Sequence, residues 1–269
     1  MGLPSTQGGL LPGRGQEQCR KIEETSFWFN HRNDVIASVV LRFSPRDTLF
    51  DIGGGNGYVS LGLQRAGVSS VVVEPGPCGA RNALERGISA VIQSTLEDAG
   101  FRSGSMGAAG LFDVLEHVED DSAFLREIHR CLRPGGCLFV TVPAFPALWS
   151  AEDDAAGHFR RYSLASLERT LQAAGFIVRY RSYFFSILVL PVILLRTLPY
   201  RVGLRKGFSL ETVEKEHAAG SGRFGTILDA ALKLELAWIR HGRRLPAGTS
   251  CLPVAARPAP GRSCHDSAA

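Results

Sequence analysis

The chain has 269 residues, 45% of them hydrophobic and 21% charged, a balance typical of a folded globular protein that excludes a disordered or collagen-like chain. Its length predicts one large domain, or one domain with an appendage. The net charge of +4 is too small for a dedicated nucleic-acid-binding protein, so nucleic acid is not an expected partner.

The two ends of the chain differ from its middle. Residues 1–16 are rich in Gly and Pro and lack the long apolar core of a secretory signal. We interpret residues 1–16 and residues 259–269 as disordered tails. One domain is therefore expected over residues 17–258. Its first part, residues 17–45, is expected to be a helical cap with a helix from about Glu17 to Leu41.

Short β-rich runs alternate with helical patterns through the middle of the chain. Strands are expected at Thr48–Ile52, Ser70–Glu74, Ala90–Ser94, Ala108–Phe112, Cys137–Pro143, Phe176–Tyr183 and Thr249–Ala256. Helices are expected at Tyr58–Arg65, Gly79–Glu85, Ser122–Leu132 and Leu164–Ala174, with Asp121 or Ser122 capping the third. This alternation predicts an α/β fold with a doubly wound, mostly parallel sheet that binds ligands at the carboxyl ends of its strands.

The first expected strand runs directly into a glycine-rich turn, with glycines at positions 53, 55 and 57. Glycines there allow backbone N–H groups to approach a ligand closely. The G-x-G-x-x-G pattern of dinucleotide-binding proteins is absent, because Tyr58 occupies the position of its third glycine. This difference counts against a nucleotide-dependent oxidoreductase.

Two carboxylates flank this turn. Asp51 lies two residues before its first glycine, where it would repel a pyrophosphate but attract an ammonium group. Glu74 ends the next strand, where a carboxylate can bind both hydroxyls of a ribose. The pair favours a cofactor with a sugar and a positive group but no phosphates, and S-adenosylmethionine is such a molecule.

Further motifs resemble those of the class I, seven-stranded, Rossmann-like S-adenosylmethionine-dependent methyltransferases. The stretches FDVLEHVEDD (112–121) and LRPGGCL (132–138) are similar to that superfamily's fourth-strand motif and to its Pro-Gly-Gly turn before the fifth strand. More narrowly, four segments resemble a bacterial subfamily of methyltransferase-domain proteins of mostly unassigned substrate. These segments are SFWF (26–29) with Arg32-Asn33, VPA (142–144) with LWS (148–150), GHFRRY (157–162) and LPAGTS (245–250). The resemblance covers about Glu23 to Pro258.

The resemblance implies roles for several residues. In that family the glycine loop contacts the methionine part of the cofactor, the carboxylate after the second strand binds the ribose, and residues after the third strand flank the adenine. Here these positions are Gly53, Gly55 and Gly57, then Glu74, then Thr95 and Leu96.

Two positions depart from the family pattern. Thr95 stands where many relatives have an acid that reaches the adenine amine. Gly107 stands where relatives usually have Asp, in the dipeptide Phe-Asp, and it is expected to weaken the fourth strand locally.

Three residues are candidates for a general base. The sulfonium group makes the methyl group electrophilic, so the protein must mainly align an acceptor and exclude water, and a base helps where the acceptor carries a proton. His117 and Asp113 follow the fourth strand, and His158 lies in a loop after the fifth. The alternatives are a packing or capping role for His117, a structural hydrogen bond for His158 and a contact of Asp113 with the cofactor's amino group.

Five residues are candidates for acceptor binding: Arg160, Arg161, Tyr162, Trp28 and Arg32. The two loop arginines would suit an anionic acceptor, or they could instead pair with the acids at positions 152–154. Trp28 and Arg32 would close the cofactor mouth, or the aromatic residue could belong to the core. The acids at positions 119–121 are interpreted as a solvated helix start, and no metal is expected.

The run Tyr183–Leu195 is almost purely apolar but too short to span a membrane, and it contains Pro191. It begins an insertion, residues 183–244, that is expected to form the acceptor pocket. Seven basic residues and no acidic one lie between Arg169 and Lys206. Two interpretations are open: a buried element or lid over the pocket, or contact of residues 183–206 with a membrane surface.

Six cysteines are far apart and include no C-x-x-C pair, which argues against a zinc site or a disulfide framework and indicates a reducing compartment. We therefore expect a cytoplasmic protein, either free or peripheral at the inner face of the membrane.

The leading hypothesis is an enzyme that transfers a methyl group by in-line displacement from S-adenosylmethionine to an O, N or C atom of a small-molecule or lipid-linked acceptor. One alternative is a catalytically silent, membrane-associated binding protein with the methyltransferase fold. The other is the nucleotide-dependent oxidoreductase.

Overall fold

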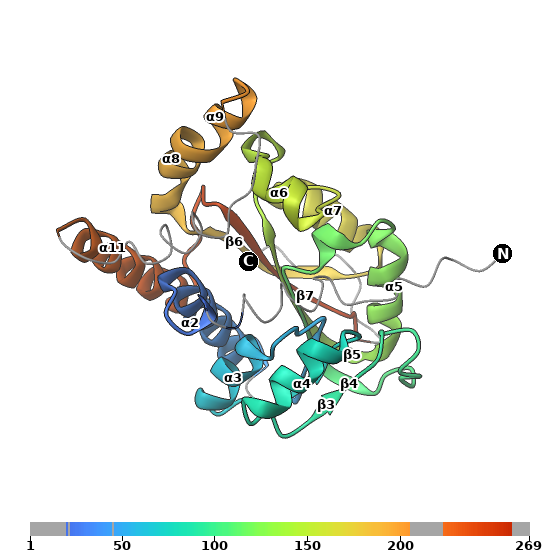
Figure 1. Ribbon diagram of the computed structural model, residues 1–269. Coiled ribbons are helices and arrows are strands. Elements are labelled where there is room, and N and C mark those ends of the chain that lie inside the picture. The colour runs from blue at the N-terminus through green and yellow to red at the C-terminus, as the bar shows by residue number, and fades with distance from the viewer. Residues whose placement is uncertain (1–19, 21, 45, 205–222, 260–269) are drawn as a thin grey trace.

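The computed structural model describes residues 20, 22–44, 46–204 and 223–259 (Figure 1). Its centre is a seven-stranded sheet with the strand order β3-β2-β1-β4-β5-β7-β6. The strands are β1 (Leu49–Ile52), β2 (Ser70–Val73), β3 (Val91–Ile92), β4 (Met106–Phe112), β5 (Leu132–Pro143), β6 (Ile177–Phe184) and β7 (Ser250–Ala256). The first five pair in parallel, and β7 runs antiparallel to both β5 and β6. The predicted α/β fold with a mostly parallel sheet is confirmed.

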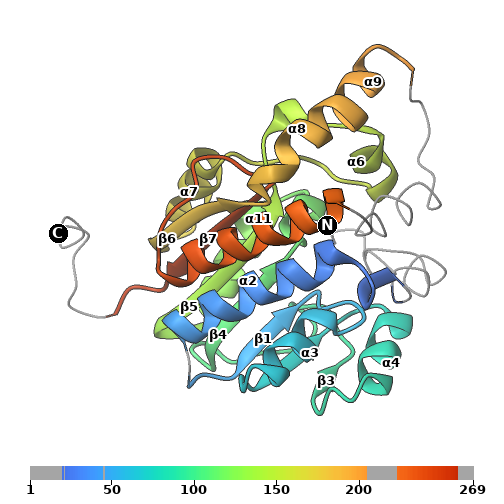
Figure 2. The same ribbon diagram turned by 90° about the vertical axis from the view of Figure 1, so that its left-hand side faces the viewer.

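Helices cover both faces of the sheet (Figures 1 and 2). One face carries α2 (Phe27–Phe43), α3 (Tyr58–Arg65), α4 (Pro77–Glu85) and α11 (Arg223–Arg240), and the other carries α5 (Asp121–Cys131) and α7 (Leu164–Ala173). Because both faces are covered, the central strands are apolar throughout, as in β4, where all residues except Gly107 are buried. Parallel strands joined by such helices end together at one edge, which is where the candidate site forms.

The N-terminal helix and α5 begin at other residues than expected. The helix predicted from Glu17 to Leu41 is interrupted, and α2 starts at Phe27, where the Ser26 hydroxyl accepts from the N–H groups of Trp28 (3.2 Å) and Phe29 (3.4 Å). The cap of α5 is Asp120, whose Oδ1 accepts from the Ala123 N–H at 2.8 Å. The expectation of Asp121 or Ser122 was wrong, because the helix begins one residue earlier.

Gly107 allows a close approach of Asp47 to β4. A Cβ atom at this position would overlap the Asp47 carboxylate, which also pairs with Arg133 of β5 (2.7 Å). The pairing of β4 with β5 shifts register between Met106 and Ala108. The departure from the family pattern is therefore accommodated by the neighbouring acid at the strand end away from the site.

The insertion continues β6 into a helical segment. Its parts are a 3-10 turn (Ser186–Leu188), α8 (Val189–Val192), a π-helical turn (Ile193–Thr197) and α9 (Leu198–Arg201), and together they project from the body of the protein (Figure 1). Across the described ranges, every helix falls short of the length or apolarity needed to cross a membrane. The expected tail at 1–16, the expected tail at 259–269 apart from its first residue, and the insertion residues 205–222 lie outside the described residues.

Glu235 of α11 joins three elements in the interior. Its carboxylate bonds to His31 of α2 at 2.9 Å and accepts from the N–H groups of Phe185 (2.6 Å) and Ser186 (2.8 Å), where the insertion begins. Burial by itself would raise the pKa of Glu235, but these hydrogen bonds outweigh burial and lower it. Phe185 has a positive φ of 60° and stacks on Trp28. Glu235 therefore fixes the insertion, α2 and α11 relative to one another (Figure 2).

We expect Glu235→Ala to lower the free energy of unfolding by about 3 kcal/mol, because it leaves two backbone donors and a histidine buried without their acceptor. Urea denaturation checks this. The loss should shrink at acid pH, since a carboxyl whose pKa is lowered by folding stabilises the fold only while it is ionised. Asp229→Ala on the same helix removes only an exposed pair with Lys233 and should have almost no effect.

Candidate functional site

The glycine turn lies between the end of β1 and the start of α3. Gly53, Gly55 and Gly57 all have positive φ, between 53° and 71°. Gly57 is the N-cap of α3, and a Cβ atom there would lie 2.8 Å from the Cβ of Ala83 in α4. Glycine is required at position 57 both by the backbone conformation and by the contact with α4.

Asp51 is buried in β1 beneath this turn, with an exposed fraction of 1%. Its Oδ2 accepts a hydrogen bond from the Ser60 hydroxyl of α3 at 2.9 Å. Burial raises the pKa of Asp51 to about 6, and the nearby carboxylate of Glu74 adds to this effect, while Ser60 and Arg32 oppose it. A positive ligand group above the turn would therefore favour the ionised form of Asp51.

Glu74 follows β2 and is also 1% exposed. Its two carboxylate oxygens accept hydrogen bonds from the backbone N–H groups of Gly55 (2.9 Å) and Gly76 (2.7 Å). Glu74 thus fixes the conformation of the glycine turn. It also lines the cavity above the turn.

A smaller cavity of about 220 Å³ opens above the turn. Asp51, Glu74 and residues 53–55 line it, together with Phe29 and Arg32 of α2. Three of the predicted cofactor residues do not belong to this lining. They are Gly57, which packs against α4, Thr95, whose hydroxyl bonds to Asp98 (2.9 Å), and Leu96, which is buried in the core.

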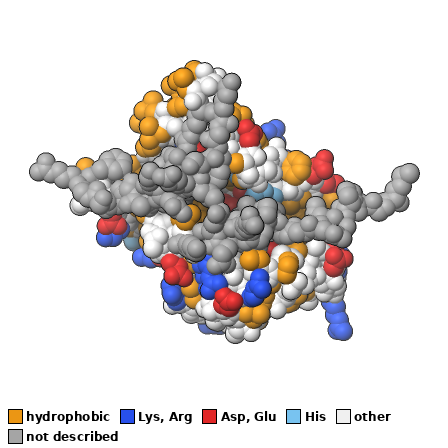
Figure 3. Space-filling view, in the orientation of Figure 1, with side chains coloured by type: hydrophobic (Ala, Val, Ile, Leu, Met, Phe, Trp, Pro, Cys, Tyr) orange, Lys and Arg blue, Asp and Glu red, His pale blue; other side chains and the backbone are white. Residues whose placement is uncertain are grey.

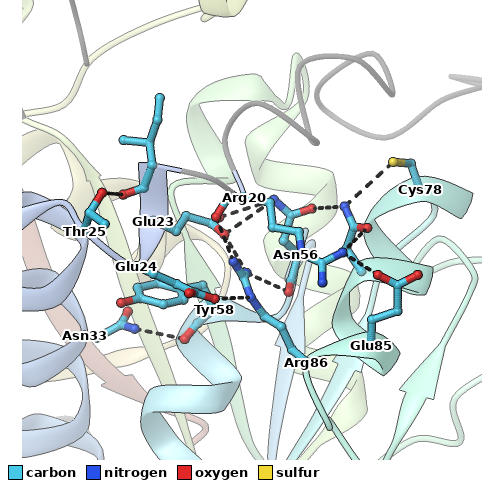
Figure 4. A network of polar contacts seen from close by, with 12 residues as sticks. Arg20, Glu23, Glu24, Thr25, Asn33, Asn56, Tyr58, Cys78, Glu85 and Arg86 are labelled. Carbon is cyan, nitrogen blue, oxygen red and sulfur yellow. Dashed lines mark hydrogen bonds and ion pairs between the residues drawn. The ribbon is translucent and has the colours of Figure 1, made fainter. Parts of the chain in front are cut away.

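The N-terminal segment is attached to the rim of the smaller cavity by a network of polar contacts (Figure 4). Arg86 pairs with Glu23 and donates to the backbone oxygen of Asn56 at 2.9 Å, while its guanidinium lies 5.0 Å from the ring centre of Tyr58. The Asn56 side chain in turn contacts Glu23 and accepts from Asn82 (3.0 Å). Through these contacts Glu23, which lines the cavity, is held against the glycine turn.

A larger cavity of about 480 Å³ lies beside the smaller one. Phe29, Asp113, His117 and Ala156 line both, so the two cavities meet at these residues. The helical segment of the insertion contributes apolar side chains to the wall of the larger cavity, as do α2 and α11. These side chains are Leu188, Pro191, Val192, Leu195, Phe27, Trp28 and Leu228.

Asp113 lies at this junction in a strained conformation, with a positive φ of 58°. Its Oδ1 accepts from the Thr141 hydroxyl (3.0 Å), and its Oδ2 is paired with Arg32. The Arg32 guanidinium also lies near the rings of Trp28 (5.0 Å) and Phe29 (5.3 Å). Because both oxygens of Asp113 have partners, its contacts hold α2 over the end of β4. The structure thus brings Trp28, Arg32 and Asp113 together, a contact that the sequence did not predict.

His117 and His158 also meet at the wall of the larger cavity, with ring centres 4.7 Å apart. Burial lowers the pKa of His117 to about 4, and the positive charge that His158 can carry lowers it further. His158 Nδ1 lies 2.8 Å from Oδ1 of the fully buried Asp153. Burial would raise the pKa of Asp153, but the bonds from His158 and Arg161 lower it.

Glu116 precedes His117 and is fully buried, and within the described chain neither of its carboxylate oxygens has a hydrogen-bond partner. Burial and the nearby Asp113 carboxylate raise its pKa well above the ordinary value.

The loop residues predicted to bind the acceptor separate into two groups. Arg161 lines the larger cavity and bonds to Asp153 (2.7 Å), so it pairs with one of the acids considered as alternatives. Arg160 pairs with Asp121 (3.0 Å), and the Tyr162 hydroxyl donates to the same carboxylate at 2.8 Å. Neither Arg160 nor Tyr162 lines either cavity.

Sequence reasoning missed Glu116, Asp153 and Glu23 as residues of the site. Glu116 precedes the candidate histidine His117, and this position alone could have indicated that it belongs to the site. Asp153 entered only as a partner for arginines, because its contact with His158 forms within a turn that the spacing does not specify. Glu23 is brought to the site by Arg86 and Asn56, which are distant from it in the sequence.

Comparison with known proteins gives consistent findings. A family model described as a methyltransferase domain matches residues 28–180. A Mycolicibacterium smegmatis protein named "Probable S-adenosylmethionine-dependent methyltransferase" is 27% identical over 190 residues, covering 65% of this chain and 68% of that protein. A ubiquinone biosynthesis O-methyltransferase of Xanthomonas oryzae is 31% identical over 99 residues, covering 35% of this chain and only 41% of its own length.

Two solved structures share the fold. A Haloferax volcanii protein, solved in complex with a methyltransferase activator, has a TM-score of 0.60 at 16% identity, covering 94% of this chain and 100% of its own. The Haemonchus contortus phosphoethanolamine N-methyltransferase 2, solved with S-adenosyl-L-methionine, has a TM-score of 0.56 at 17% identity, covering 92% and 57%.

We expect the affinity for S-adenosylmethionine to rise about tenfold between pH 5 and pH 7.5, because ionised Asp51 attracts the ammonium group of the cofactor. Calorimetric titration checks this. Asp51→Asn should bind more weakly at pH 7.5 and show a much smaller pH dependence, whereas Asp47→Asn, at the other end of the sheet, should behave as the wild type. Equal pH dependence in wild type and Asp51→Asn would contradict this role.

Proposed function

The chain belongs to the methyltransferase-domain family and uses S-adenosylmethionine, and on that basis we propose that it methylates an apolar, lipid-like acceptor bound in the larger cavity. The observation that supports this most directly is the junction of the two cavities. Asp113 and His117 line both, so a cofactor in the smaller cavity and an acceptor in the larger one would meet at these side chains.

The wall of the larger cavity supports an apolar acceptor. The insertion contributes Leu188, Val192 and Leu195, and α2 contributes aromatic rings. The two arginines in this wall already face acids, since Arg161 pairs with Asp153 and Arg196 lies 4.0 Å from Glu152. The wall therefore suits the binding of a hydrocarbon chain better than the binding of an anionic group.

In the smaller cavity, we assign the cofactor to Asp51, Glu74 and the glycine turn. Ionised Asp51 suits the ammonium group, and the Glu74 carboxylate at the end of β2 suits the ribose hydroxyls. Residues 53–55 line the same space, and their N–H groups hold the turn in place, since Gly53 donates to the backbone oxygen of Val73 (2.8 Å) and Gly55 to Glu74 (2.9 Å). S-adenosylmethionine, when bound, supplies the electrophilic methyl group.

At the junction, we assign activation of the acceptor to the cluster of Glu116, His117 and His158. These side chains line the larger cavity beside Asp113. Asp113 is a positioning residue, because Arg32 and Thr141 already occupy both its oxygens. Ala156 and the aromatic rings of α2 exclude water from the junction, which favours displacement by the acceptor over hydrolysis.

Transfer to oxygen is favoured among the candidate atoms. The Xanthomonas relative is named for O-methylation in ubiquinone biosynthesis, and its similarity covers only a third of this chain. A hydroxyl acceptor must lose a proton, and the cluster at the junction offers two imidazoles beside the reacting position.

The proposal is tested with S-adenosylmethionine carrying a radioactive methyl group and an extract of the source organism. We expect label in the organic phase after solvent extraction. Val192→Trp, which fills the larger cavity, should lower the initial rate about tenfold or more and leave the cofactor Kd unchanged. Val202→Trp, at the exposed residue that directly follows α9, should retain the wild-type rate. Label confined to protein or to water-soluble compounds would contradict the lipid-like acceptor, and cofactor binding without any transfer would contradict enzymatic activity.

We also propose that the insertion contacts a membrane surface. Leu190, Leu194 and Leu198 lie four residues apart and are 67%, 58% and 50% exposed. Figure 3 shows hydrophobic side chains gathered over α8 and α9. The opposite face of the same segment lines the larger cavity, so contact with lipid would place the entrance next to an apolar acceptor.

Flotation with vesicles containing anionic lipids tests this contact. The wild type should float with the vesicles, and a double variant Leu194→Glu, Leu198→Glu should not, because two carboxylates replace the apolar stripe. Leu84→Glu is the matched control, since Leu84 is 57% exposed on α4, outside this segment. A wild-type protein that does not float with the vesicles would contradict the proposed membrane contact.

A further inference from the structure

Three potential ligand atoms converge beside the junction of the cavities. Glu116, His117 and His158 each offer one such atom, and these atoms lie within 4.8 Å of one another. Glu116 and His117 belong to the turn Leu115–His117 that follows β4, and His158 follows the short helix α6 (Ala151–Ala156). A hydrogen bond from the Phe159 N–H to the backbone oxygen of Glu116 (2.8 Å) joins the two segments.

The buried carboxylate of Glu116 has no hydrogen-bond partner among the described residues. The residue has no exposed surface. The neighbouring acids have partners: the half-buried Asp113 is held by Arg32 and Thr141, and the buried Asp153 by His158, Arg161 and Ser150. A buried carboxylate is normally paired with a cation, protonated or bound to a metal.

The two histidines are oriented as metal ligands are. His158 bonds through Nδ1 to the buried Asp153, which leaves Nε2 with a free lone pair, and metal-binding histidines usually have such a carboxylate behind them. The His117 ring lies against that of His158, with ring centres 4.7 Å apart. The histidines and both acids line the larger cavity.

We propose that Glu116, His117 and His158 bind a divalent transition metal ion of the zinc type. Two imidazoles and one carboxylate are a ligand set that zinc and its neighbours in the first row prefer, whereas magnesium prefers oxygen alone. Ligand atoms around such an ion lie about 3.4 Å apart, so the side chains would close inward by a small rotation. The three side chains line the larger cavity, so a further ligand of the ion would come from that cavity.

This site deepens the proposed function in one respect. With the ion bound, His117 and His158 would be ligands rather than bases. The divalent cation beside the acceptor would then lower the pKa of an acceptor hydroxyl, so that its proton leaves to solvent before the oxygen attacks the methyl carbon. That consequence rests on the proposed function, whereas metal binding itself does not. No metal was expected from the sequence, because His158 is separated from Glu116 by 41 intervening positions and reaches it only in the folded chain.

The test uses the full chain without a histidine tag, stripped with a chelator and titrated calorimetrically with Zn²⁺ and with Mg²⁺. We expect one equivalent of Zn²⁺ to bind, with Mg²⁺ at least about a hundredfold weaker. Co²⁺ should give visible absorption bands typical of nitrogen and oxygen ligands. Glu116→Gln and His158→Asn should each weaken Zn²⁺ binding by about tenfold or more. His241→Asn, on the exposed end of α11, should bind as the wild type.

Absence of Zn²⁺ binding to the wild type, or equal binding by the Glu116 and His158 variants, would overturn the site. His117→Asn changes a side chain that is only partly buried, so it tests the same site if Glu116→Gln does not fold, as judged by circular dichroism. A titration with S-adenosylmethionine on the same samples separates the two proposals. Cofactor binding without Zn²⁺ binding would reject the metal and leave the methyltransferase intact.

Discussion

The cost of burying carboxylates is the constraint on which the site depends. Asp51, Glu74 and Asp153 are buried around the two cavities at the carboxyl edge of the sheet, where water is largely excluded. An ionised carboxylate without a partner is too costly in such surroundings, so the fold must supply one for each. Glu74 uses the backbone of the glycine turn, Asp51 a helix hydroxyl, and Asp153 a histidine and an arginine.

Meeting this requirement also assembles the protein around the site. Arg32 reaches Asp113 only because α2 crosses the end of β4, and His31 of the same helix bonds to Glu235 of α11. Glu235 in turn accepts the N–H groups at the start of the insertion. The charged groups around the site thus also position the helices that enclose it. Glu116 is the exception, because no described residue provides a hydrogen-bond partner for its carboxylate.

Predictions from the sequence agree with the structure where the interactions join residues close along the chain, and they fail where the interactions join distant residues. The helix predicted at Tyr58–Arg65 has those bounds in the structure, because a glycine turn and an amphipathic pattern define it locally. The cap of α5 was misplaced, since the neighbouring Asp120 and Asp121 are both good N-cap residues and the contacts of Asp121 with Tyr162 and Arg160 form only in the folded chain. Arg160 was expected at the acceptor, but that same contact with Asp121 draws it away from both cavities.

The sequence by itself determined the alternating fold, the glycine turn, the two carboxylates that flank it and, from these, the class of cofactor. Each of these depends on residues that are close along the chain or at the ends of adjacent strands, where periodicity and spacing are enough. Only the tertiary structure decided that the cavities meet at Asp113 and His117, and that His158 lies beside Glu116. Such contacts join segments far apart in the chain, and their geometry is set by how helices and loops pack, which no local pattern encodes.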